Sequence, residues 1–341
     1  MLKKERFLIL LIALGLINAR VEAVNYTTPL TGASISLTGA DTVDVSGSGP
    51  AISVSAGGTL QITGDPMIKF NSGTINRNTG IRGIAGANLQ LGSGTKIRIS
   101  DAMDGIYYSG NPVDASNVRI KGNNIDFIHN SQGTVTSSNA NGMRISSVMV
   151  ELTGKNSFST IVSSEKTSAN TLVITNSSFK AEQINVYAED VGNGSDGISP
   201  LRSIIDLGTG SFITTVSPAA ASRGVYMGNS STLTAKELTI QSSGGAAQTA
   251  GIISGPQPTA PNSIQLDDST ISATGSSNVS YGIATLNTAV TLNSVDISVG
   301  GDKLVAGLYT DQNTVAQLTN TTINATSNTG KSYGMVALGP S

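Results

Sequence analysis

The 341-residue chain has no cysteine, no tryptophan and a single histidine, His129. Without cysteine it forms no disulfide bonds and offers no thiolate ligands for zinc. Charged residues make up 12% of the sequence, about half of the ~25% found in ordinary soluble domains. Disordered chains combine high charge with few β-branched residues, and this chain is instead rich in Val, Ile and Thr. These features predict a β-rich, turn-rich protein.

The apolar residues near the N-terminal end alternate with polar ones in short runs. Examples are Ile35-x-Leu37, Val43-x-Val45, Ile52-x-Val54 and Leu60-x-Ile62, which are separated by Gly, Ser, Asp and Asn. Alternation with a period of two, interrupted by turn residues, indicates short strands joined by tight turns. The 39 glycines supply many of these breaks.

A longer repeat runs through the rest of the chain. A Gly-aliphatic pair is followed by two apolar residues five positions apart, as in Gly282-Ile283 with Leu292/Ile297 and Gly307-Leu308 with Leu318/Ile323. Successive units start 26 or 33 residues apart. The further Gly-aliphatic pairs are Gly83-Ile84, Gly105-Ile106, Gly142-Met143, Gly197-Ile198, Gly224-Val225 and Gly251-Ile252, and the further apolar pairs are Ile174/Phe179, Leu207/Phe212, Leu233/Leu238 and Leu266/Ile271. A repeat of this length is typical of stacked, near-identical coils.

The repeat predicts an all-β fold, a right-handed parallel β-helix of roughly 11–13 rungs. About 26 residues accommodate three short strands and three turns, and equivalent strands then lie about 4.8 Å apart. We expect Leu266, Leu292 and Leu318 to form one interior file. Asn176, Asn293 and Asn320 are expected at turns in left-handed geometry. The repeated glycines are expected to let the backbone bend at a corner.

Two other repeat folds fit the sequence less well. A β-propeller usually carries a Trp-Asp mark, and a leucine-rich solenoid needs Leu-x-x-Leu-x-Leu; both patterns are missing from the sequence. The β-helix is expected to fill residues 24–341 as one domain. Residues 190–196 and the proline-rich residues 255–261 are expected to form loops at its corners.

Residues 1–23 have the pattern of a signal peptide. Lys3, Lys4 and Arg6 precede an apolar run at 7–17, which is too short to span a bilayer comfortably. Small residues before position 24 predict cleavage between Ala23 and Val24. The alternative is a buried helix or a membrane anchor. Cleavage leaves 16 basic and 20 acidic residues, and this weakly negative balance disfavours nucleic acid or an anionic membrane as partner.

The N-terminal pattern, the lack of cysteine, the low charge and the unit Tyr281-Gly282-Ile283 with Leu292-x-x-x-x-Ile297 together resemble the passenger domains of bacterial autotransporters, the pertactin-like and adhesin-like group. The resemblance covers residues 24–341. It implies export through the inner membrane, display at the cell surface or outer membrane or release, and a role in adhesion, aggregation or biofilm formation.

The sequence departs from this family at its C-terminal end. Family members continue into a membrane β-barrel, whereas this chain stops at Ser341, just after Gly334-Met335 opens another unit. We therefore expect a truncated product with no barrel of its own for anchoring, which would be periplasmic if the barrel is truly missing. An inert remnant of a disrupted gene is a further alternative.

Histidine chemistry has little support in the sequence. A serine protease of this family would carry the motif Gly-Asp-Ser-Gly. The most similar segment of this chain is Gly194-Ser-Asp-Gly197, in which Ser and Asp stand in the reverse order. His129 is therefore expected to be a solvated or structural residue.

Polysaccharide-processing β-helices use clustered carboxylates as acid and base. Here Arg119-Ile-Lys121 precedes Asp267-Asp268, the reverse of the polygalacturonase order, and Gly-His-Gly is missing. The first segment is expected to be a strand with its charges outward and the second a turn. Asp101, Asp104 and Asp126 could still meet across rungs.

Metal and cofactor motifs are also missing from the sequence. Asp190, Asn193 and Asp196 could hold calcium, but an ordinary polar loop is the preferred interpretation. We therefore predict no catalytic, cofactor-binding or metal-binding residues, and no cofactor.

The sequence is interpreted as an exported, non-catalytic adhesin or aggregation factor that binds unidentified host-cell, matrix or bacterial surface molecules. Tyr107, Tyr108 and Tyr226 are the residues expected to anchor an interface, with core packing as the alternative for each. The rival function is an exported polysaccharide lyase or hydrolase. Three or more charged residues lining one cleft would favour the enzyme, and a face of Ser, Thr and Asn would favour the adhesin.

Overall fold

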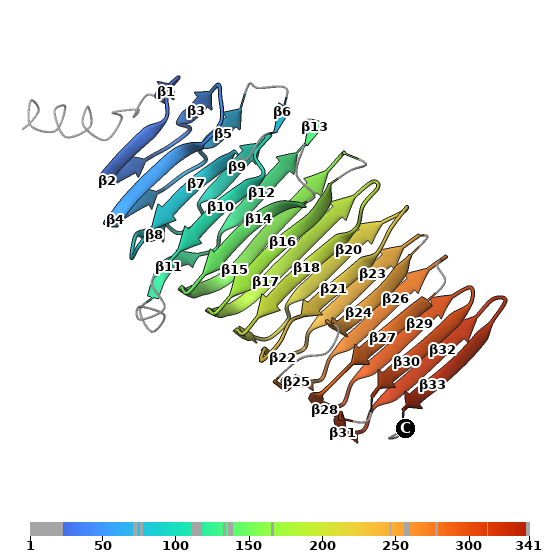
Figure 1. Ribbon diagram of the computed structural model, residues 1–341. Coiled ribbons are helices and arrows are strands. Elements are labelled where there is room, and N and C mark those ends of the chain that lie inside the picture. Colours follow the sequence, from blue (N-terminus) through green and yellow to red (C-terminus); the bar gives the residue numbers. More distant parts are fainter. Residues whose placement is uncertain are drawn as a thin grey trace, which may run out of the picture.

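A computed structural model describes residues 23–70, 74–75, 78–110, 118–131, 134–135, 139–164, 167–245, 247–255, 260–276, 279–311 and 313–338. These residues form no α-helix. Thirty-one strands belong to one continuous sheet that winds into a rod, with its N-terminal strands at one end and its C-terminal strands at the other (Figure 1). Of the predicted signal peptide and cleavage site, only Ala23 and Val24 lie within the described residues.

The strands recur in the same order around three sides of the rod. Side 1 contains β7 (Thr79–Ile84), β10 (Asp104–Ser109), β14 (Asn139–Ser146), β16 (Ser168–Thr175), β18 (Ser195–Leu201), β21 (Ser222–Met227), β24 (Gln248–Ser254), β27 (Val279–Thr285), β30 (Leu304–Thr310) and β33 (Lys331–Ala337). Side 2 contains β8 (Asn88–Leu91), β11 (Val118–Asn123), β19 (Ile204–Leu207), β22 (Thr232–Lys236), β25 (Asn262–Asp267), β28 (Thr288–Asn293) and β31 (Val315–Thr319).

Side 3 contains β1 (Asn25–Tyr26), β3 (Thr42–Val45), β5 (Met67–Phe70), β9 (Lys96–Ser100), β12 (Asp126–Ser131), β20 (Phe212–Ser217), β23 (Thr239–Gly244), β26 (Thr270–Gly275), β29 (Asp296–Gly301) and β32 (Thr322–Ser327). Four longer strands run around a corner. They are β2 (Leu30–Leu37) and β4 (Pro50–Ile62), from side 1 to side 2, and β15 (Met149–Val162) and β17 (Ser178–Asp190), from side 2 to side 3. The short strands β6 (Thr74–Ile75) and β13 (Thr134–Val135) pair with each other.

Parallel pairing confirms the predicted β-helix. One file of side 1 contains twelve residues in continuous register, so the described strands complete eleven turns, the lower end of the predicted range. The file comprises Leu30, Ile52, Ile81, Ile106, Met143, Leu172, Ile198, Val225, Ile252, Ile283, Leu308 and Met335. On side 2, Leu266 pairs with Leu292 and Leu292 with Leu318, as predicted; Leu266 and Leu292 are interior, whereas Leu318, in the last coil, is exposed. At about 4.8 Å per turn, the rod is roughly 50 Å long.

The core consists of such files of aliphatic side chains, most of them fully buried. Each buried Leu, Ile or Val contributes about 1.5–3 kcal/mol relative to an exposed one, so stacking stabilises strands that are too short to stand alone. Aromatic side chains fill the middle of the rod, where the rings of Phe127 and Phe158 lie 5.6 Å apart between centroids.

The repeated glycines serve close packing, which corrects the predicted role. None of the glycines that precede the side 1 file has a positive φ, so no bend requires them. A Cβ at Gly105 would lie 2.6 Å from the carbonyl oxygen of Gly142 and 2.7 Å from Cζ of Phe127. The first unit of the repeat lies three residues before the predicted position, because Ile81 pairs with Ile106 whereas Gly83 pairs with Tyr108. Gly80-Ile81 is therefore the repeat unit, and Gly83-Ile84 is not.

Left-handed turn residues follow strands of sides 1 and 2. Asn176 and Asn320 have φ values of 47° and 49°, as predicted. The prediction for Asn293 was wrong by one position, because Asn293 is the last residue of β28 and Ser294 has the φ of 56°. Asp268 has a φ of 48° at the equivalent place, which confirms it as a turn residue, whereas Asp267 is the last residue of β25. Short polar side chains tolerate this conformation best.

Among the described residues, we find no helix with the length and apolar character of a membrane span.

Candidate functional site on side 1

Side 1 carries two columns of residues outside the apolar core file. The column before the glycines contains Thr79, Asp104, Asn141, Asn170, Asp196, Arg223, Ala250, Tyr281, Ala306 and Tyr333. The column after the core file contains Arg82, Tyr107, Arg144, Val173 and Ser199, then Tyr226, Ile253, Ala284, Tyr309 and Val336. All but Ala284 in the second column are half-buried or exposed, so this column forms surface.

The N-terminal part of the first column is a ladder of hydrogen-bonded polar side chains. Nδ2 of Asn141 donates to Oδ1 of Asp104 over 2.6 Å, and Nδ2 of Asn170 donates to Oδ1 of Asn141 over 3.2 Å. All three residues are buried by their neighbours in the stack. This burial raises the pKa of Asp104, although the Asn141 amide and the Arg144 charge oppose the shift. The ladder joins three successive coils.

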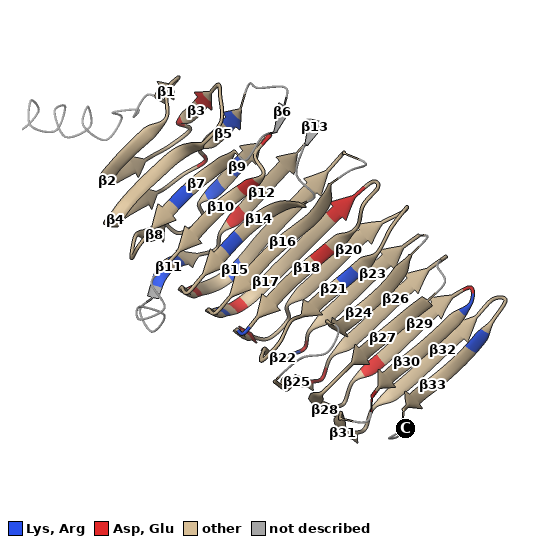
Figure 2. Cartoon of the chain, viewed as in Figure 1, with Lys and Arg blue, Asp and Glu red and all other residues tan. Residues whose placement is uncertain are grey.

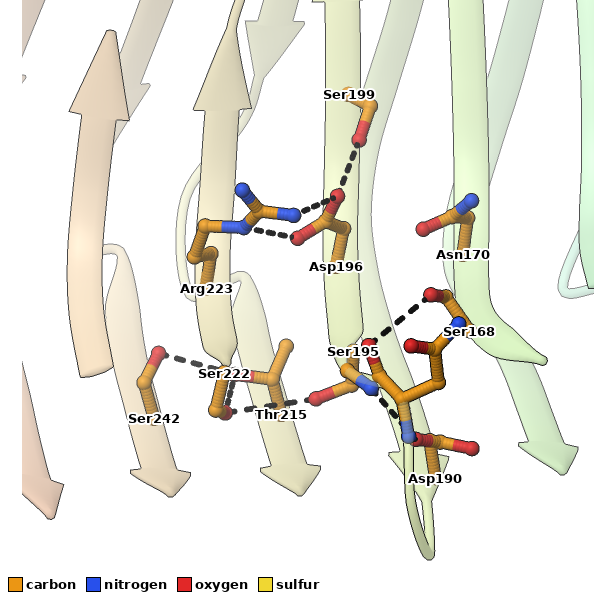
Figure 3. A network of polar contacts seen from close by, with 12 residues as sticks. Ser168, Asn170, Asp190, Ser195, Asp196, Ser199, Thr215, Ser222, Arg223 and Ser242 are labelled. Atoms are coloured by element: carbon orange, nitrogen blue, oxygen red, sulfur yellow. Dashed lines mark hydrogen bonds and ion pairs between the residues drawn. The ribbon is translucent and has the colours of Figure 1, made fainter. Parts of the chain in front are cut away.

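The middle of side 1 is held by an ion pair between adjacent coils (Figure 3). Nε of Arg223 donates to Oδ1 of Asp196 over 2.6 Å, and its Nη2 donates to Oδ2 over 3.0 Å. The guanidinium also lies 4.3 Å from the centroid of the Tyr226 ring. Burial raises the pKa of Asp196, and Arg223 opposes that shift. The paired geometry fixes the orientation of Tyr226 at the surface.

Two surface pockets lie along the second column. The larger, of about 350 Å³, is lined by Val173, Thr175, Ser199, Pro200, Leu201, Tyr226, Gly228, Asn229 and Gly255. The smaller, of about 140 Å³, is lined by Gln248, Ile253, Ser254, Tyr281, Ala284, Thr285, Leu286 and Tyr309. The registered run Tyr226, Ile253, Ala284 and Tyr309 connects them, and we call this run the tyrosine strip.

Charge is distributed unevenly along side 1 (Figure 2). Strands β7, β14 and β21 carry arginines, and β10 and β18 carry aspartates. In contrast, β24, β27 and β30 contain no charged residue. None of the residues that line the smaller pocket is charged.

The three tyrosines predicted to anchor an interface have different environments. Tyr226 is half-buried and lines the larger pocket, as the surface interpretation requires. Tyr107 is also half-buried, with the guanidinium of Arg144 5.6 Å from its ring centroid. Tyr108 is 1% exposed and belongs to the core, so the surface interpretation was wrong for it; burial raises the pKa of its hydroxyl. Its side chain alternates with that of Tyr107 along β10, because neighbouring strand residues face opposite ways.

His129 is a structural residue in the interior of side 3. It is fully buried, in register with Ile99 and Thr160, and its Nε2 lies 2.9 Å from the Ala102 carbonyl oxygen. Burial lowers its pKa to about 4, although the hydrogen bond with Ala102 opposes the shift. The expectation of solvation was wrong, and the structural alternative was right.

The candidate carboxylates Asp104 and Asp126 lie on different sides of the rod, and Asp101 is a left-handed turn residue after β9. Asp104 is buried on β10, whereas Asp126 begins β12 on another side, where it pairs with Lys96 over 3.1 Å. Asp104 and Asp196 share a column but lie three coils apart, roughly 14 Å at 4.8 Å per coil. Glycosidase carboxylates stand about 5–9.5 Å apart. Arg119-Ile-Lys121 is a strand with Ile120 buried and Lys121 exposed, as predicted.

The loop after β17 is organised by Asp190. Oδ2 of Asp190 accepts hydrogen bonds from the N–H groups of Gly192, Asn193 and Gly194. Asp196 is instead paired with Arg223, so the two carboxylates serve different structures. No group of three or more potential metal-ligating side chains occurs among the residues that the structure describes. The ordinary loop remains the preferred interpretation.

A third pocket, of about 220 Å³, lies on side 2 and contains three charged residues, Glu151, Lys180 and Glu182. This is the number of charges that would favour an enzyme. However, Oε2 of Glu182 accepts the N–H of Gly154 over 2.6 Å, and Glu151 is in register with Lys180. The register continues from Lys121 through Glu151 and Lys180 to Asp206, so opposite charges alternate along the column. This pattern is typical of structural charge pairing.

Sequence reasoning did not identify Tyr281 and Tyr309 as site residues. Their rings lie 5.4 Å apart between centroids, although 28 positions separate them in the sequence. The signal was present in the repeat: Tyr281 precedes Gly282 and Tyr309 follows Leu308, and stacking of the units places these positions on neighbouring coils.

No protein-family model, no curated protein and no solved structure matches this chain.

Proposed function

We propose that this chain is an exported β-helix that acts at the cell surface as a non-catalytic adhesin or aggregation factor, and that side 1 is its contact surface. The observation that carries the proposal is the tyrosine strip, a registered row in which Tyr226, Ile253 and Tyr309 are half-buried and Ala284 is buried, with a pocket at each end. The signal-like N-terminus and the resemblance to autotransporter passengers support the location.

The rod suits binding through repeated contacts. The side 1 strands from β7 to β30 are paired along both edges, so a rigid sheet holds the tyrosine strip. Its side chains therefore lose little conformational freedom on binding. Aromatic residues commonly contribute the largest share of interface energy. Tyr226 and Tyr309 lie three coils apart, about 14 Å, so one extended molecule reaches both pockets.

The spacing of carboxylates supports binding rather than hydrolysis. Asp104 and Asp196 lie in the same column, but Asp104 is hydrogen-bonded to Asn141 and Asp196 is paired with Arg223. Their separation of three coils is larger than the distance that acid–base glycoside hydrolysis uses between its two carboxylates. The lyase or hydrolase therefore gains no support from side 1.

We expect the double substitution Tyr226→Ala and Tyr309→Ala to weaken adhesion at least tenfold, because it removes both aromatic anchors while leaving the core intact. The measurement is binding of the labelled full chain to bacterial cells, epithelial cells and matrix-coated surfaces. Tyr187→Ala is the matched control, since Tyr187 is half-buried on side 3. Equal binding by the double variant and the control would overturn the assignment of side 1.

A further inference from the structure

The smaller pocket on side 1 has the shape and chemistry of a site for one sugar ring. We propose that Tyr281 and Tyr309 form a subsite that binds a pyranose ring of a neutral glycan, with the rest of the glycan extending along the tyrosine strip. This inference rests on the proposed function of side 1 and gives its ligand a chemical class.

The two tyrosine rings form an open, tilted pair. Their centroids are 5.4 Å apart and their planes meet at 46°, so neither ring covers the face of the other as a parallel stack would. Both side chains are half-buried, and burial together with the neighbouring Tyr309 raises the pKa of Tyr281. The Tyr281 hydroxyl therefore stays neutral at physiological pH and serves as a hydrogen-bond donor and acceptor.

The size of the pocket fits a single ring. Its volume is about 140 Å³, and a cavity of roughly 150 Å³ holds one six-membered ring such as benzene. Pockets for drug-sized ligands are larger, about 300–1,000 Å³. The subsite therefore takes one unit of a longer molecule.

The lining combines apolar contact with a few polar groups. Ile253, Ala284 and Leu286 add apolar surface beside the tyrosines, while Gln248 and Ser254 supply an amide and a hydroxyl. Ser254 Oγ accepts the N–H of Leu286 over 2.7 Å, which leaves its own O–H to donate. Thr285 also lines the pocket, and its buried hydroxyl has no hydrogen-bond partner in the described part of the chain. A sugar ring matches this lining, since its C–H groups form an apolar face and its hydroxyls project from the edge.

The charge distribution favours a neutral glycan over an acidic one. Strands β24, β27 and β30 contain no charged residue, so nothing on them forms an ion pair with a sulfate or carboxylate.

A peptide ligand is disfavoured for a different reason. Extended peptides commonly bind by adding a strand to a free sheet edge, and each of these three strands already pairs with a strand on both sides.

The test uses the methyl glycosides of glucose, galactose, mannose and N-acetylglucosamine as neutral probes, and methyl glucuronide and methyl sialoside as acidic ones. Saturation-transfer NMR on the full chain identifies which probes bind, and tyrosine fluorescence gives the affinity in a protein that lacks tryptophan. We expect at least one neutral glycoside to bind with a Kd on the order of 1 mM, as a ligand of this size allows.

Three variants assign the binding to the pocket. Tyr309→Ala is expected to weaken it at least fivefold, Tyr309→Phe to retain it within twofold because the ring remains, and Tyr187→Ala to leave it unchanged. Unfolding temperatures of the variants establish that each is folded. Binding of acidic probes alone, binding of no probe, or equal binding by Tyr309→Ala would overturn the proposal.

The outcome is separable from that of the proposed function. If no glycoside binds and yet the Tyr226→Ala, Tyr309→Ala double variant loses adhesion, side 1 is the contact surface but its ligand is not a neutral glycan. Adhesion to periodate-treated cells tests the same point independently, because periodate oxidises vicinal diols of glycans and leaves most peptide partners intact. Adhesion that survives this treatment does not depend on such glycans. Glycoside binding without any effect of the double variant on adhesion would instead overturn the proposed function alone.

Discussion

Substituting Gly251 by alanine is expected to destabilise the β-helix by about 3 kcal/mol or more. The added Cβ would lie 2.7 Å from the carbonyl oxygen of Gly282 and closer still to Cγ2 of Ile271. Overpacking a core typically costs about 1–3 kcal/mol, and here one obstacle is backbone of the next coil, which cannot change rotamer. Denaturant unfolding followed by circular dichroism measures the change.

Gly300→Ala is the matched control for this substitution. Gly300 lies in β29, its φ is not positive, and the nearest atoms to an added Cβ belong to Thr274 at 3.8 Å or more. We expect no loss, or a gain of up to about 1 kcal/mol, because alanine reduces the entropy of the unfolded chain. If both substitutions lower stability equally, the glycine file does not act through close packing. Because each coil contacts only its neighbours, unfolding of the Gly251→Ala variant is expected to begin around β24 and β27.

Acidification is expected to destabilise the folded chain through His129, by about 3 kcal/mol. Burial lowers its pKa to about 4 in the folded state, against 6.5 when it is exposed, and each unit of difference corresponds to about 1.36 kcal/mol. At pH values between these two pKa values, the imidazole is mostly protonated in the unfolded chain and mostly neutral in the folded chain. The loss therefore begins as pH falls through about 6.5 and is complete below about 4.

The contacts of His129 explain why it resists protonation. Its Nε2 donates to the Ala102 carbonyl, while Nδ1 is buried with no hydrogen-bond partner in the described part of the chain. A proton on Nδ1 would place an unpaired charge beside Ile99 and Thr160.

His129→Gln supplies the comparison, because glutamine does not titrate in this range. We expect the wild-type chain to lose about 3 kcal/mol more than the variant between pH 7 and pH 4, as measured by urea unfolding. Groups such as Asp104 and Asp196, whose raised pKa values give the opposite trend, act equally in both proteins. Parallel pH profiles for the two proteins would show that His129 is accessible to protons in the folded state.

The apolar repeat allowed the fold to be predicted, because stacking requires equivalent residues to recur at the pitch of the coil. Leu266, Leu292 and Leu318 therefore identify one file of paired residues from spacing alone, and Leu266 and Leu292 are buried in the core. The function of Gly251 did not follow in the same way. A glycine that avoids a clash and one that permits a bend look identical in sequence, and only the position of Ile271 on side 3 distinguishes them.

The candidate site depended on facts that a repeat pattern does not contain. Tyr107 and Tyr108 are adjacent, yet one faces outward and the other inward, and the sequence does not fix which strand face is the core. Tyr281 and Tyr309 meet because β27 and β30 pair in a register that places Tyr309 beside Ala284. The coils differ in length, so the sequence separation of two residues does not give their register. The sequence neighbours of His129, Ile128 and Asn130, do not indicate its burial, since the residues that surround it in space come from other coils.

The most direct test of side 1 as the contact surface is tyrosine footprinting of the chain bound to cells. Iodination followed by mass spectrometry reports the accessibility of each tyrosine with and without bound cells. Protection is expected at Tyr226, Tyr281 and Tyr309, with Tyr187 on side 3 unchanged. Protection of Tyr187 with the other three still reactive would place the contact on another side of the rod and contradict the account.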